Sequence, residues 1–141
     1  MNFYLPVFMV VCSNVVYHLC AKSISPKSNT FATLAITYVI GAALTLTVYY
    51  MTSPEKKLVE EFSHLNWANL VLGFAIVGLE AGNILMYKAG WSISLGPIVT
   101  SISSALALIL LGRLLFQEVI VLRQALGAVL CMTGLILINL K

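Results

Sequence analysis

Apolar residues along the chain gather into five long, almost charge-free runs, at about residues 3–21, 31–52, 67–87, 96–116 and 119–140. Each run is close to the roughly 20 residues with which an α-helix crosses about 30 Å of hydrocarbon. Membrane strands need only about half that length and alternate polar with apolar positions, which these runs do not. The pattern therefore predicts an all-α, polytopic membrane protein in which residues 1–141 form a single domain of five transmembrane helices.

The longest polar interval, between the second and third runs, has the features of a short amphipathic helix. The tripeptide at 53–55 (SPE) is a helix-start signal, and Leu58, Phe62 and Leu65 then share one helical face. We expect a helix over about residues 54–65, lying on the membrane surface. Its role is either plain connection or lipid sensing, and the sequence leaves both open.

Composition strengthens the membrane assignment and excludes several classes of function. Hydrophobic residues make up 60% of the chain and charged residues 9%, whereas soluble domains have roughly 25% charged residues. The net charge of +3 is spread in ones and twos, which argues against nucleic acid as a partner. The three cysteines lack metal-ligand spacing, and neither a nucleotide-binding loop nor a catalytic arrangement occurs. The sequence predicts no enzyme, no metal and no cofactor.

Basic residues, whose excess normally marks the cytoplasmic side, are balanced between the two sides. With five crossings, the side of the amino terminus holds Lys56, Lys57, Arg113 and Arg123, and the other side holds Lys22, Lys27, Lys88 and Lys141. Either a partner or the terminal charge fixes one orientation, or the chain inserts both ways and pairs with itself. In the second case it forms a ten-helix antiparallel homodimer, the symmetry on which many transporters build alternating access.

Glu80 is the strongest candidate for a functional residue, because it is an acidic residue deep within a predicted span. Asn83 and Tyr87 follow it at i+3 and i+7 on the same helical face. Lys88 is two turns away, about 12 Å along the axis, so a direct pair with Glu80 is not expected. Two roles remain open: a site for substrate or protons, and a structural carboxyl group between helices.

A polar stripe on the first span is a second candidate. Asn14, His18 and Lys22 follow one another at i+4 steps, with Tyr17 beside them, so we expect the stripe to face inward rather than toward lipid. His18 is either a hydrogen-bonded residue between helices or a proton relay.

Small and hydroxyl-bearing residues form stripes on the last two spans. The fourth carries Thr100, Ser101 and Ser104, which either join helices or line a polar cavity, and the fifth carries Gly127, Cys131 and Gly134. Small side chains let another helix approach closely, so we expect a dimer interface on the fifth span.

The stretches 82–94 (GNILMYKAGWSIS) and 127–139 (GAVLCMTGLILIN), together with 116–118 (FQE), resemble a single EamA-type unit of the drug/metabolite transporter superfamily. They are similar in particular to its five-span bacterial/archaeal transporter group. The resemblance implies a secondary transporter of the inner (plasma) membrane, built of ten helices from two chains and moving a small organic solute.

The last two runs and the segment 14–22 also resemble the small multidrug resistance family, more distantly. Its four-span members work as antiparallel dimers with an essential carboxylate in the first span. The matching position here is Asn14, and the acidic residue is Glu80 in the third run. We hypothesise that Glu80 replaces that carboxylate.

The expected function is secondary-active, proton-coupled transport of a small solute or metabolite by a dual-topology homodimer. The alternative is a non-transporting membrane assembly partner, or a subunit of a lipid-carrier flippase. The mass of the purified particle separates the two, because an obligate heteromer favours the alternative.

Overall fold

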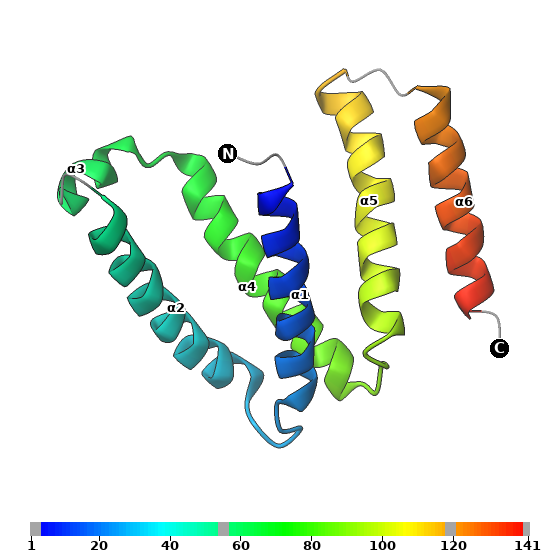
Figure 1. The fold of residues 1–141 in the computed structure, drawn as a ribbon. Coiled ribbons are helices and arrows are strands. Elements are labelled where there is room, and N and C mark those ends of the chain that lie inside the picture. Colours follow the sequence, from blue (N-terminus) through cyan, green and yellow to red (C-terminus); the bar gives the residue numbers. More distant parts are fainter. Residues whose placement is uncertain (1–3, 54–56, 118–120, 140–141) are drawn as a thin grey trace. The chain divides into compact units, whose positions relative to one another are not determined.

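A computed structural model describes residues 4–53, 57–117 and 121–139 of the chain, and within these ranges the regular structure is entirely helical. Its elements are α1 (Leu5–Ser23), α2 (Thr30–Thr52), α3 (Leu58–Glu61), the 3₁₀ turn η1 (Phe62–His64), α4 (Trp67–Lys88), α5 (Leu95–Leu115) and α6 (Leu122–Asn139) (Figure 1). The predicted all-α class is therefore confirmed.

Each long helix coincides with one of the apolar runs. Four of them, α1, α2, α4 and α5, are long and apolar enough to cross a membrane. Helix α6 lies within the fifth run, whose predicted start at residue 119 falls outside the described residues. The fifth crossing thus stays a prediction, whereas the length and composition of the other four helices support a multi-pass membrane protein.

The predicted surface helix at 54–65 is present in part, as α3 followed by η1. Its expected start at residues 54–56 lies outside the described residues. Phe62 and Leu65 are exposed, as a face directed at a membrane surface requires, but whether that face contacts lipid stays a prediction.

Side-chain caps set the starts of two spans. Asn29 precedes α2, and its side-chain oxygen accepts the backbone N–H groups of Phe31 and Ala32 at 2.9 and 3.1 Å. Asn66 precedes α4 and accepts the N–H of Ala68 at 2.9 Å, while the Asn69 side chain accepts the Asn66 N–H in return. These bonds satisfy N–H groups that lack a partner in the first helical turn. Both spans therefore begin at residues fixed by local chemistry.

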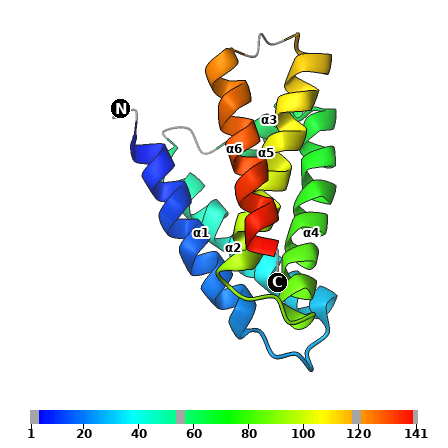
Figure 2. The same ribbon diagram turned by 90° about the vertical axis from the view of Figure 1, so that its right-hand side faces the viewer.

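The chain divides into two compact units. The terminal unit comprises residues 1–19 and 90–141, and the central unit comprises residues 20–89. Helices α5 and α6 run side by side within the terminal unit (Figures 1 and 2). In the central unit α2 packs against α4.

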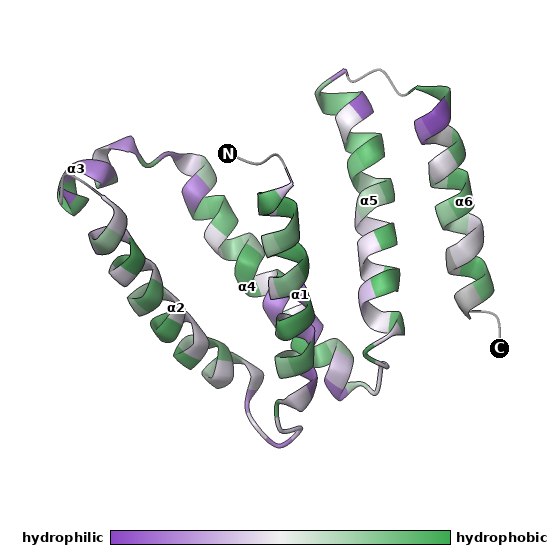
Figure 3. Cartoon of the chain, viewed as in Figure 1, coloured by the Kyte–Doolittle hydropathy of each residue, from purple (hydrophilic) through white to green (hydrophobic). Residues whose placement is uncertain are grey.

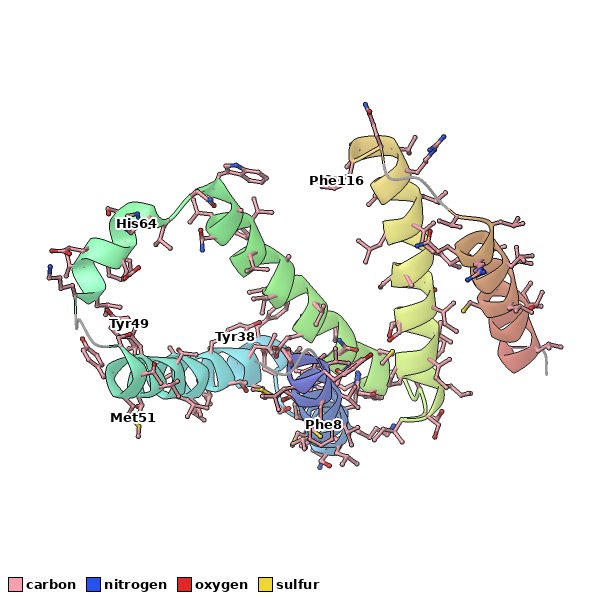
Figure 4. All side chains as sticks on the ribbon, turned by 45° about the horizontal axis from the view of Figure 1, so that its top comes forward. Phe8, Tyr38, Tyr49, Met51, His64 and Phe116 are labelled. Atoms are coloured by element: carbon pink, nitrogen blue, oxygen red, sulfur yellow. The ribbon has the colours of Figure 1, made fainter. Side chains whose placement is uncertain are left out.

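The core of the central unit lies at one end of the α2/α4 pair. Leu34, Ala81 and Ile84 form a buried cluster, against which Ile24 and Tyr38 pack. From this cluster the axes of α2 and α4 diverge toward α3 (Figure 4). The two helices are therefore joined at the end where α2 begins and α4 finishes.

Apolar side chains cover the outside of the long helices. Phe8 is 66% exposed, Val39 70% and Phe74 81%, and Figure 3 shows hydrophobic positions along the spans, with hydrophilic ones concentrated at α3 and at helix ends. In water such a surface would drive aggregation. In a bilayer the hydrocarbon chains solvate it, so the small internal core is consistent with a membrane protein.

Candidate functional site

Glu80 lies on α4 and is partly buried. It directly precedes Ala81, a residue of the buried cluster. Asn83 is also partly buried, and its side-chain amide donates to the Leu79 carbonyl of the same helix at 3.0 Å. Tyr87, two turns from Glu80, is only 5% exposed. The three predicted residues therefore share the side of α4 that is partly or fully buried.

Tyr38 of α2 is a residue near Glu80 that the sequence analysis did not identify. Its ring packs against the Leu34, Ala81 and Ile84 cluster, and Ala81 directly follows Glu80. Figure 4 shows Tyr38 on the side of α2 that faces α4, whereas Met51 points away. The Tyr38 ring thus packs on the part of α4 that adjoins Glu80.

Two lysines lie at the end of the central unit beyond Tyr87. The amino group of Lys22 lies 5.5 Å from the centroid of the Tyr87 ring, within the range of a cation–π contact. The amino group of Lys88 donates to the Ser28 carbonyl at 2.5 Å and to the Thr30 hydroxyl at 3.1 Å. These two bonds join the end of α4 to the start of α2.

The stripe on α1 lines two open pockets in the terminal unit. Asn14 and His18, with Pro97 of α5, belong to a pocket of about 350 Å³. Asn14 also borders a second pocket, of about 450 Å³, together with Ser13 and Tyr17. Asn14 therefore reaches both pockets, and polar side chains line otherwise apolar walls.

Aromatic packing holds the middle of this stripe. The rings of Tyr17 and His18 meet edge to face, with centroids 5.1 Å apart and an interplanar angle of 73°. Lys22, the last member of the predicted stripe, lies in the central unit on Tyr87. The stripe is thus shared between the two units.

The hydroxyl groups on α5 differ in what they contact. Thr100 donates to the carbonyls of Gly96 and Pro97 in its own helix, at 3.1 and 3.2 Å. Such a bond within the helix uses the hydroxyl hydrogen locally. Ser101 and Ser104 are exposed, so they remain the candidates on this helix for contacts with a solute or another helix.

The predicted interface stripe on α6 is open within the described chain. Gly127 and Cys131 are exposed and Gly134 is partly exposed. A Cβ atom built at Gly127 or Gly134 meets no heavy atom within 4 Å. The small size of these residues is therefore not needed for packing in this part of the chain.

The predicted site residues fall into two sets. Glu80, Asn83 and Tyr87 belong to the central unit, with Tyr38 as an added member, and the terminal unit holds Asn14, Tyr17, His18, Thr100, Ser101 and Ser104. Among the described residues, no group of three or more His, Cys, Asp or Glu side chains can hold a metal ion.

Comparison with known protein families gives a match that covers nearly the whole chain. Residues 2–140 match the EamA-like transporter family. The chain belongs to this family. Neither a curated protein nor a solved structure matches it significantly. As an EamA-like chain with four membrane-spanning helices, it is a transporter-like membrane protein rather than a member of an enzyme family.

Membership in the EamA-like family confirms the resemblance drawn from the stretches 82–94 and 127–139. The match also extends to the first two helices, for which the sequence analysis found less specific motifs. It identifies the kind of protein but not the solute, so the roles of Glu80 and the other site residues depend on physical argument.

Proposed function

We propose that this EamA-like chain is a secondary-active transporter that exchanges protons for a small organic solute across the inner (plasma) membrane. The observation that carries the proposal is Glu80, a partly buried acidic residue inside a helix long and apolar enough to span a membrane. Tyr38 of a second helix packs against Ala81 and Ile84, which follow Glu80 on the same helix. Charged groups at such depth are costly and are generally retained for function. Glu80 binds a proton or a cationic group of the solute, one at a time.

The transporting unit in this proposal is an antiparallel homodimer of chains inserted in both orientations. Three features support it: the balanced basic residues, the open Gly127 and Gly134 stripe, and the small core of the single chain. Two inverted copies form a pseudo-symmetric pair, and rocking one against the other exposes the site to each side in turn. Each copy contributes one Glu80, and Asn14, which borders two pockets of the terminal unit, is a further candidate for contact with the solute.

Transport in proteoliposomes tests the role of Glu80. Glu80→Gln keeps the shape of the side chain but cannot ionise, so we expect it to abolish proton-coupled uptake of a cationic solute while the particle mass stays that of a dimer. Glu61→Gln is the matched control, because Glu61 is exposed in α3 and outside the spans. We expect the control to transport at the wild-type rate.

Two results contradict the proposal. If Glu80→Gln transports at the wild-type rate and with the wild-type pH dependence, Glu80 is structural. If the purified chain is stable only together with a different protein, the alternative role as an assembly partner or flippase subunit is favoured.

A further inference from the structure

The hydroxyl group of Tyr38 is in an unusual environment. Its oxygen is buried, and no described residue offers it a hydrogen-bond partner. Buried polar side-chain atoms nearly always have such a partner, because leaving one unpaired costs free energy. The ring alone is enough for packing against Leu34, Ala81 and Ile84, so a phenylalanine would fill the same space without this cost. A bound ligand that forms a hydrogen bond with this hydroxyl group would remove that cost.

The position of this hydroxyl group is set by the packing of the ring. The buried cluster holds the ring on the side of α2 that faces α4 (Figure 4). Glu80 directly precedes Ala81 and lies one helical turn before Ile84, two residues of that cluster. A phenol oxygen and a carboxyl group thus border the same region of the central unit.

In the described part of the central unit, the two lysines at its end make contacts with other groups. Lys88 is bonded to Ser28 and Thr30, and Lys22 lies over the Tyr87 ring. A carboxylate that lacks an ionic partner at membrane depth attracts a cation from outside the chain. The phenol oxygen has lone pairs and can accept an N–H hydrogen bond. Together the two groups suit a positively charged ligand that carries several N–H donors.

We propose that Tyr38 and Glu80 jointly bind the primary ammonium group of a solute, one N–H donating to the carboxylate and another to the phenol oxygen. This inference rests on the proposed transport function and names its substrate class. A quaternary ammonium group has the same charge but no N–H donor, so it binds to Glu80 alone. Tyr38 therefore determines specificity for primary over quaternary ammonium compounds.

Binding of two matched probes to the purified full chain tests this specificity. Benzylammonium and benzyltrimethylammonium share a ring and a charge and differ in their N–H donors. Tyr38→Phe removes the hydroxyl group and keeps the ring in the buried cluster. We expect this variant to bind benzylammonium about tenfold or more weakly and benzyltrimethylammonium as the wild type does. Tyr50→Phe, on an exposed tyrosine of the same helix, should change neither affinity.

The outcomes separate this inference from the proposed function. If Tyr38→Phe weakens both probes equally or leaves both unchanged, while the wild type transports, the specificity role is wrong and the transport proposal stands. If the wild type binds benzylammonium through Tyr38 but does not transport it in proteoliposomes, the transport proposal is wrong and the site stands. If the wild type binds neither probe, the site is refuted.

Discussion

The ends of α2 and α4 are linked through Lys88, whose amino group donates to the Ser28 carbonyl and the Thr30 hydroxyl. Lys88→Met keeps an apolar stem of similar length and removes both bonds. A hydrogen bond to a charged group contributes about 1.5–3 kcal/mol when buried, and the part-buried geometry here favours a total near the lower value. We therefore expect the free energy of unfolding to fall by about 2 kcal/mol, which is roughly thirtyfold in the equilibrium constant.

An unfolding titration in detergent measures this loss, with Lys27→Met as the control. Lys27 is exposed in the same connection between α1 and α2, so its replacement should change the free energy of unfolding by less than about 0.5 kcal/mol. A double-mutant cycle with Thr30→Val isolates the bond to the hydroxyl, and its coupling energy should be about 1 kcal/mol. Equal stability of Lys88→Met and Lys27→Met would refute the reasoning.

Three further predictions concern insertion, assembly and the surface helix. A single cysteine introduced beside Lys141 should be labelled from both sides of the membrane in comparable amounts; labelling from one side alone excludes dual topology. Gly127→Leu and Gly134→Leu should each shift the particle toward monomer in mild detergent. Val129→Leu, on the opposite face of α6, should not. If all three variants stay dimeric, the interface lies elsewhere. Lys57→Gln breaks an ion pair with Glu60 at 3.3 Å, in which the two side chains are 57% and 69% exposed. The free energy of unfolding should therefore change by less than about 1 kcal/mol. A larger loss would show that the pair is buried.

The spans could be predicted from the sequence because hydropathy and length are local properties. The run at 31–52 differs from the observed α2 by one residue, since Asn29 caps the helix directly before it. The link between Lys88 and Thr30 was not predicted, although topology places both residues at helix ends on the same side. The sequence did contain a signal for it, namely a lysine that finishes one span and a threonine that begins another.

The packing of Tyr38 against Ala81 and Ile84, beside Glu80, could not be predicted, because it depends on the register in which α2 packs against α4. Hydropathy does not determine that register, and Tyr38 has no polar neighbour at helical spacing comparable to Asn83. The hydroxyl stripe on the fourth span was predicted as a set of similar residues. Thr100 differs from Ser101 and Ser104 because its hydroxyl group is bonded to its own helix, a distinction that depends on side-chain rotamers.

The position of the buried cluster makes the α2/α4 pair a lever with its fulcrum at one end. Leu34, Ala81 and Ile84 and the Lys88 link form that fulcrum, and Glu80 lies only about 6 Å from Ile84 along the axis. Tyr49 is about 22 Å beyond Leu34 on α2. At 1.5 Å of rise per residue, a 10° swing about the fulcrum would displace Glu80 by about 1 Å if α4 moves, and the Tyr49 end by roughly 4 Å if α2 moves. The carboxyl group thus keeps its geometry while the far end of the pair widens.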